Sequence, residues 1–162
     1  MNRAMSYQNL YDSTTGYMRG KDMKGNWRTP FAPVAYQGPG SVNGWGDITE
    51  GFTVQYHWTV PQDVQGLINL MGGKKEFNAM MDSVFVIPGK LGMESRGMIH
   101  EMREMQVMNM GQYAHGNQPI QHMIYLYNYA GEPWKAQYWL RQVMDRMYTP
   151  GPDGYCGDED NG

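Results

Sequence analysis

Apolar residues recur every three or four positions along much of the second half of the chain, which is the spacing of one face of an α-helix. This spacing predicts helices over 61–71, 77–84, 119–130 and 133–147. Prolines stand at or near the start of three of these stretches and glycines follow two of them, as is typical of helix ends. The residues that define the four apolar faces are Val64, Leu67, Ile68 and Met71, then Phe77, Met80, Met81 and Val84, then Ile120, Met123, Ile124 and Tyr127, then Ala136, Leu140, Val143 and Met147.

The rest of the chain has weaker or no periodicity. Residues 1–12 resemble the end of a helix that stops near Asp12 and Ser13, residues 99–110 have a weak helical spacing, and residues 51–60 have the β-branched and aromatic composition of a strand. Glycines and prolines break the remaining periods, so we expect loops at 14–50, 86–98 and 149–162. The predicted fold class is all-α with long loops, in which short turns make consecutive helices antiparallel.

Composition limits the classes of function. The 162 residues, 41% hydrophobic and 13% aromatic, are enough for one domain with a core. A net charge of -3 with scattered basic residues gives no footprint for nucleic acid or an anionic membrane surface, and no apolar run is long enough to span a membrane. Cys156 is the single cysteine, so no intrachain disulfide forms. The 16 methionines are best explained as core residues.

Many aromatic rings occur together with glycines and few charges. The chain has 12 Tyr, five Trp and 21 Gly, with 18% charged residues. Aromatic faces pack against the C–H surfaces of sugars while amides and carboxylates bind the hydroxyls, so the mixture favours a sugar-binding site. Trp45 and Trp58 are candidates, although burial in the core is the simpler explanation for any single ring.

Glu50 is a candidate general acid. It follows the glycine-rich segment and precedes an aromatic stretch that contains Tyr56 and Trp58. Aromatic surroundings disfavour the ionised form of a carboxyl group, which suits a group that must donate a proton. The alternative is a solvent-facing glutamate in a loop.

Two other segments carry polar candidates. His115, Asn117 and Gln118 stand just before a predicted helix, where the amides either cap the helix or offer hard oxygen ligands to Ca²⁺. Zinc is a poor fit because no third nitrogen or thiolate has suitable spacing. The adjacent acids of 158–160 form either a solvated tail or part of a metal or acid/base site.

Three long strings resemble the catalytic domain of glycoside hydrolase family 92, the calcium-dependent exo-α-mannosidases. They are TEGFTVQYHWTVPQDVQGLINLMGG, YAHGNQPIQHMIYLYNYAGEPWKAQ and TPGPDGYCGDEDNG, in this order. RAMSYQNLYDSTTGYMRGKDMKGNWRTPFAP is similar to the region upstream of them, so the resemblance covers nearly the whole chain.

The resemblance implies a fold and a set of roles. It implies that residues 1–162 are part of an (α/α)₆ barrel, truncated at both ends, with long active-site loops and with an amino-terminal β-sandwich domain absent. Glu50 corresponds to the general acid, and Asp158 and Asp160 to the general base and a calcium ligand in an order left open. His115, Asn117 and Gln118 correspond to the loop at the calcium and the sugar. Many members of the family have Glu where this chain has Gln118.

The activity that the resemblance implies is inverting hydrolysis of terminal α-linked mannose from oligosaccharides or N-glycans, assisted by Ca²⁺. The site residues are then Glu50, Asp158 and Asp160 for catalysis, Trp45, Trp58 and His115 for the sugar, and Asn117, Gln118 and Asp160 for the metal. The partners are a mannose-containing glycan and the missing domain, and a periplasmic or secreted location is expected. The alternative is a carbohydrate-binding or catalytically inactive family member.

Overall fold

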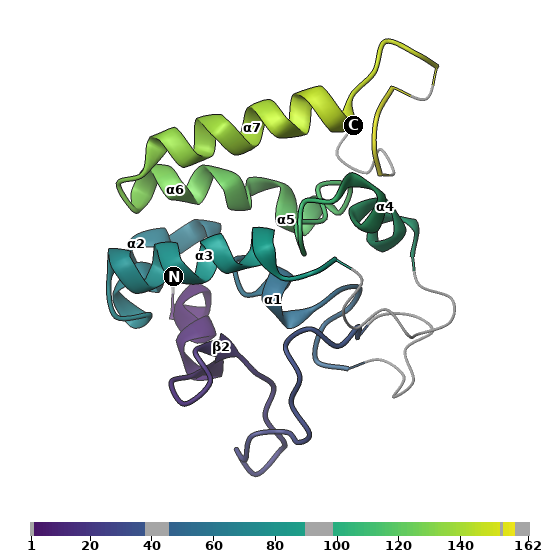
Figure 1. Ribbon diagram of the computed structural model, residues 1–162. Helices are drawn as coiled ribbons and strands as arrows, with labels where there is room; N and C mark the ends of the chain where they lie inside the picture. Colours follow the sequence, from purple (N-terminus) through teal and green to yellow (C-terminus); the bar gives the residue numbers. More distant parts are fainter. Residues whose placement is uncertain (1, 38–45, 90–98, 153, 158–162) are drawn as a thin grey trace.

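The structure is a computed structural model, and it describes residues 2–37, 46–89, 99–152 and 154–157. Most elements within this part of the chain are helices (Figure 1), so the predicted all-α class is confirmed in its coarse form. In chain order the elements are η1 (Asn2–Leu10), β1 (Tyr11–Asp12), β2 (Tyr17–Met18), α1 (Thr53–Tyr56), η2 (Pro61–Asp63), α2 (Val64–Leu70), α3 (Lys74–Val86), α4 (His100–Met108), α5 (Gln118–Gln121), η3 (His122–Tyr125), α6 (Leu126–Tyr129) and α7 (Pro133–Met147).

The longer helices stack in layers (Figure 1). Helix α7 packs along η3 and α6, and α2 contacts both α3 and α6. The face that α7 turns inward carries Ala136, Val143 and Met147, which are buried, as its apolar spacing predicts. A membrane-spanning helix would have to be longer and more apolar than any found in the described residues.

The predicted helix ends agree with the structure where glycine or proline marks them. Pro61 begins the turn η2, which leads into α2, and Gly72 and Gly73 follow α2 with φ of 97° and 115°. This left-handed region favours glycine because it lacks a Cβ. The predicted helix over 119–130 is also helical, but a 3₁₀ turn divides it into α5, η3 and α6.

Two local predictions are wrong. Residues 11–12 do not end a helix but form β1, which pairs antiparallel with β2. The Asp12 carboxylate accepts the Thr14 N–H at 3.0 Å and pairs with Arg19 at 2.9 Å, and Gly16 completes the turn with φ of 77°. The strand-like residues 51–60 contain the short helix α1 instead. Val54 and its neighbours are buried, and this packing outweighs the strand preference of their side chains.

The core joins these helices through large apolar side chains. Trp58, Phe77, Tyr113 and Tyr127 are fully buried. Among the described residues, seven methionines are buried with them, so the predicted core role is confirmed for Met71, Met81, Met102, Met105, Met110, Met123 and Met147. It is wrong for Met5, Met23 and Met144, which are exposed.

His57 is a buried histidine that connects the hairpin to α2. Its Nδ1 accepts the Met18 N–H at 3.2 Å, and its Nε2 lies 3.3 Å from Met71 Sδ. Burial lowers the pKa of His57 from 6.5 to about 3. The unfolded chain therefore takes up a proton as the pH falls below 6.5, whereas the folded chain resists protonation until about pH 3. The stability that neutral His57 contributes is complete above pH 6.5 and is lost as the pH falls toward 3.

We expect this single group to remove about 2 kcal/mol of stability between about pH 7 and about pH 5. Urea unfolding of the wild type and of His57→Gln, which does not titrate, measures the effect. The stability difference between the two proteins should shrink as the pH falls. A difference that stays constant with pH would contradict the assignment.

Candidate functional site

The segment that contains Glu50 is held by backbone and side-chain hydrogen bonds. The Gln37 N–H donates to the Gly51 carbonyl at 2.9 Å. The Gln55 side chain is fully buried; its Oε1 accepts the Phe52 N–H at 3.1 Å and its Nε2 donates to the Gln112 carbonyl at 2.9 Å. Glu50 itself is half-buried at the edge of this arrangement. Its carboxylate is therefore attached to a fixed backbone and still accessible, as a general acid requires.

Asn117 connects this segment to the second predicted site segment. It occupies the N-cap position of α5, but its side chain makes no capping hydrogen bond. Its Nδ2 instead donates to the Glu50 carbonyl at 3.0 Å. Asn117 is 1% exposed, and its Oδ1 has no hydrogen-bond partner among the described residues. The capping alternative is wrong for Asn117, and a buried amide oxygen is left available to a ligand.

Two tyrosines are close enough to Glu50 for its charge to act on their hydroxyl groups. Burial raises the pKa of Tyr56 to about 12, and the charges of Glu50 and Glu101 act in the same direction. Burial also raises the pKa of Tyr36, and Glu50 and Glu101 again add to the effect. Both phenols therefore stay protonated near neutral pH and can donate hydrogen bonds. Glu50, Glu101, Tyr36, Tyr56 and Asn117 form a polar cluster at the start of α1, which we call the Glu50 cluster.

His115 stands two residues before Asn117, and each of its ring nitrogens is hydrogen-bonded to a tyrosine hydroxyl. Its Nδ1 is 2.7 Å from the Tyr113 hydroxyl and its Nε2 is 2.8 Å from the Tyr148 hydroxyl. Burial lowers the pKa of His115, so the neutral ring donates one of these bonds and accepts the other. In this arrangement His115 holds the end of α7 close to the loop that contains Asn117.

The other predicted site residues divide into two groups. Trp45, Asp158 and Asp160 lie outside the described residues, so their predicted roles stay predictions. Gln118 is half-buried at the start of α5, next to Asn117 in the chain. Among the described residues, no three His, Cys, Asp or Glu side chains come together as a metal site. The predicted calcium ligands in this part of the chain are therefore amide oxygens alone.

Trp58 is a core residue. Its side chain is fully buried, its ring packs edge-on against Phe77 with centroids 5.2 Å apart, and its Nε1 donates to the Val54 carbonyl at 3.0 Å. A buried indole has no face for a sugar, so the substrate-binding role predicted for Trp58 is wrong. Sequence reasoning missed Tyr36, whose pKa the charge of Glu50 raises, and Glu101, whose charge acts on Tyr36 and Tyr56 in the same direction. No local pattern signals either residue, because only the tertiary fold brings them close to Tyr56.

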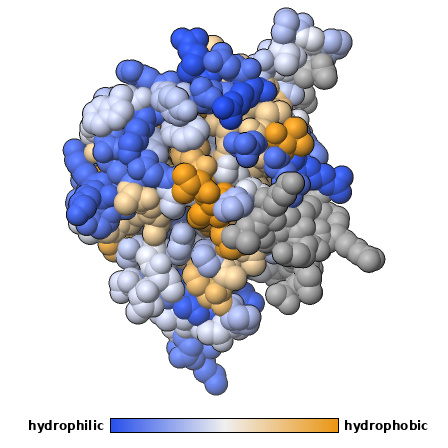
Figure 2. All heavy atoms as spheres, in the orientation of Figure 1, coloured by the Kyte–Doolittle hydropathy of each residue, from blue (hydrophilic) through white to orange (hydrophobic). Residues whose placement is uncertain are grey.

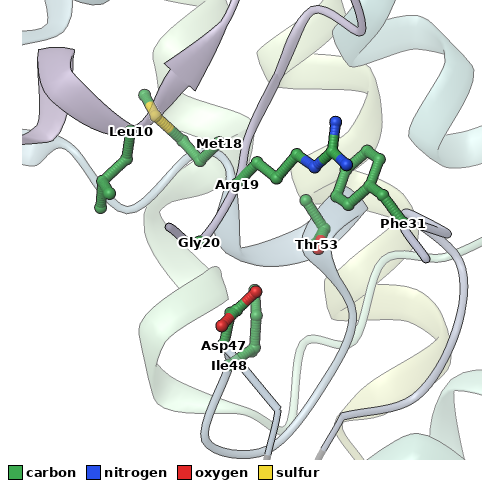
Figure 3. Close-up of a pocket in the computed structure, with 8 residues that line it drawn as sticks. All are labelled: Leu10, Met18, Arg19, Gly20, Phe31, Asp47, Ile48 and Thr53. Atoms are coloured by element: carbon green, nitrogen blue, oxygen red, sulfur yellow. The ribbon is translucent and has the colours of Figure 1, made fainter. Parts of the chain in front are cut away.

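A small cavity is lined by side chains from the 47–53 segment and from residues 10–31 (Figure 3). Its volume is about 90 Å³. In Figure 3 the Asp47 carboxylate lies next to Gly20, while Arg19 extends toward Phe31. Arg28 pairs with Asp47, and the Arg19 guanidinium lies 4.8 Å from the centre of the Phe31 ring. Arg19 also pairs with Asp12, so among the described residues the charged side chains that line the cavity already have partners.

Comparison of the sequence and the structure with known proteins identifies the protein family of the chain. The sequence profile of the glycosyl hydrolase family 92 catalytic domain matches residues 1–162. Among solved structures, the chain is similar to the family GH92 alpha-mannosidase BT3965 from Bacteroides thetaiotaomicron in complex with mannoimidazole, with 52% identity and a TM-score of 0.81 over 99% of this chain. It is also similar to the family GH92 inverting mannosidase BT2199 from Bacteroides thetaiotaomicron VPI-5482, with 49% identity and a TM-score of 0.74 over 99% of this chain. The search of curated proteins returned no match.

The chain therefore belongs to glycosyl hydrolase family 92, and the resemblance seen in the sequence is confirmed. It spans 20% of the length of the first of these structures and 21% of the second.

Proposed function

We propose that the protein hydrolyses terminal α-linked mannose from oligosaccharides or N-glycans, with inversion of the anomeric centre and with Ca²⁺ in the site. The observation that carries the proposal is the position of Asn117, whose buried amide holds the Glu50 carbonyl and leaves its own Oδ1 without a partner in the described residues. One side chain thereby links the segment of the predicted acid to the segment of the predicted metal ligands. The family and its mannosidase relatives support the choice of sugar.

In this mechanism Glu50 donates a proton to the departing glycosidic oxygen. Asp158 or Asp160 removes a proton from the attacking water on the opposite face of the sugar. Inversion requires the two carboxyl groups to stand roughly 6.5 to 9.5 Å apart, so that water fits between them and the sugar. The Tyr56 hydroxyl remains protonated near neutral pH, and it lies within hydrogen-bond reach of the Asn117 side chain.

The donor set suits calcium. Asn117 and Gln118 carry amide oxygens and Asp160 a carboxylate, which are hard ligands of the kind that Ca²⁺ prefers over soft-ligand metals. When bound, calcium supplies a fixed positive charge for sugar hydroxyl groups. We further propose that the chain acts within a longer polypeptide, as part of an (α/α)₆ barrel next to a β-sandwich domain, because it spans a fifth of its solved relatives.

Hydrolysis of an aryl α-mannoside and of a mannose disaccharide by the full-length polypeptide tests the function. NMR spectra recorded during turnover should show β-mannose as the first product, since inversion of an α-linkage gives the β-anomer. α-Mannose as the first product would contradict inversion. Absence of hydrolysis, with retained binding of the disaccharide, would favour the carbohydrate-binding alternative.

The 162-residue chain alone is expected to show no measurable hydrolysis. Its site would lack the parts supplied by the rest of the polypeptide, and apolar residues gather near the middle of the face shown in Figure 2. Helix α7 also exposes Trp134, Tyr138 and Met144, at 59%, 57% and 61%. Such surfaces promote association, so light scattering should detect aggregates. Clear turnover by the purified chain would contradict this expectation.

A further inference from the structure

Glu104 anchors the segment that leads into the acidic residues 158–160. It lies in the middle of α4 and is half-buried. Its Oε2 accepts the Gly157 N–H at 2.8 Å, and its Oε1 is 3.1 Å from His100 Nδ1. A hydrogen bond to a carboxylate is stronger than one between neutral groups. One helix therefore fixes the peptide that immediately precedes Asp158 in the chain.

Gly157 also presses against Gly116. A Cβ placed on Gly157 would lie 2.3 Å from the Gly116 carbonyl oxygen and 2.7 Å from its Cα. A Cβ placed on Gly116 would lie 2.7 Å from Glu104 Oε2 and 2.9 Å from the Gly157 Cα. Gly157 has φ of 83°, a conformation that side chains disfavour. The two backbones can approach this closely only because both positions are glycine.

These contacts form a continuous connection between the two predicted catalytic segments. Gly157 precedes Asp158, and Gly116 precedes Asn117, whose Nδ2 donates to the Glu50 carbonyl at 3.0 Å. Glu104 contacts both glycines. The backbone at Gly157 is therefore connected to Glu50 in two steps. Gly157 packs against Gly116, and Asn117, the next residue of that loop, holds the Glu50 carbonyl.

We propose that Glu104, with Gly116 and Gly157, is a positioning residue that fixes the peptide before Asp158 relative to the Glu50 segment, and that the predicted base at 158 or 160 depends on this contact to act. The proposal rests on the proposed function. It assigns Glu104 no contact with the substrate. The burial of Cys156, together with the nearby Glu104 charge, raises the pKa of that thiol, in agreement with a carboxylate held against this segment.

The test compares Glu104→Ala and Glu104→Gln in the full-length enzyme. Gln keeps an oxygen that accepts the Gly157 N–H, whereas Ala removes it. We expect Glu104→Ala to lower kcat by about 10- to 100-fold with KM within about threefold, and Glu104→Gln to stay within about threefold of the wild type. Activation of water is needed whatever the leaving group, so Glu104→Ala should lower kcat to the same extent on an aryl mannoside and on a disaccharide.

Glu76→Ala, which removes an exposed carboxylate from the first turn of α3, is the matched control and should leave kcat unchanged. If Glu104→Ala does not fold by circular dichroism, Glu104→Asp replaces it, because the shorter side chain keeps the charge and withdraws it from Gly157. A Glu104 variant that loses thermal stability but keeps the wild-type kcat would overturn the positioning role, and so would equal losses in Ala and Gln. A wild type that hydrolyses no mannoside would overturn the proposed function first, and the positioning role with it.

Discussion

Glu50→Gln in the full-length enzyme is expected to lower kcat by about 10³-fold on mannose disaccharides, and far less on aryl mannosides with good leaving groups. A proton is needed only where the departing oxygen is a poor leaving group, so loss of the acid affects the two substrates unequally. Gln has nearly the same shape as Glu. The hydrogen bond from Asn117 reaches the backbone carbonyl of residue 50 and not its side chain, so the substitution leaves that anchor intact.

Steady-state kinetics on both substrates measure this difference, and Glu76→Gln serves as the control at an exposed carboxylate. Equal losses on both substrates would show that Glu50 is not the acid. The pattern also distinguishes Glu50 from Glu104, whose removal should affect both substrates alike. A kcat for Glu50→Gln within about threefold of the wild type on disaccharides would leave the Glu50 cluster with a binding role only.

Removal of calcium is expected to abolish activity, and added Ca²⁺ to restore it. Asn117→Ala should weaken calcium binding, because it deletes the buried Oδ1 and also frees the Glu50 carbonyl. Gln118→Glu should bind Ca²⁺ at least as tightly as the wild type, since affinity rises with the number of charged ligands. Elemental analysis of the purified enzyme and calorimetric titration of the chelated enzyme measure these effects.

Asn78 offers a matched control for Asn117. It is also buried, its Nδ2 donates to the Ala130 carbonyl at 3.3 Å, and its Oδ1 likewise has no partner among the described residues. It lies on α3, outside the Glu50 cluster. Asn78→Ala should therefore cost stability without changing the calcium requirement. Full activity after exhaustive chelation, with no calcium left in the protein, would refute the metal assignment and leave the carboxylate pair untouched.

The helices could be predicted because their signals are local. Spacing placed Leu67 and Ile68 on a buried face, and Gly72 marked the end of α2, since each effect depends on neighbours in sequence. The hairpin at Tyr11 was missed because its turn is stabilised by the Asp12 side chain and by Arg19, while its composition gives no strand signal.

For the candidate site, the sequence identifies residues but not the contacts between them. Glu50 and Asn117 stand in distinctive strings, but the hydrogen bond between them joins residues 67 positions apart. The sequence also predicted a contact that the fold does not make. Trp58 is near Glu50 in the chain, but its ring points into the core. Side-chain direction on a short helix such as α1 depends on packing against distant elements, which spacing alone does not specify.

Hydrogen bonds attach the loop before α5 to the end of α3 and to the residues that follow it. Gln112 donates its N–H to the Val84 carbonyl at 2.7 Å and its Nε2 to the Pro88 carbonyl at 2.7 Å. Phe85, the next residue of α3, stacks on Trp139 with ring centroids 3.9 Å apart. We therefore expect a change in the packing of Phe85 to shift the loop that holds Asn117. For an engineer of this family, substitutions at Phe85 or Trp139 are then a way to shift the loop of Asn117 without changing Asn117 itself.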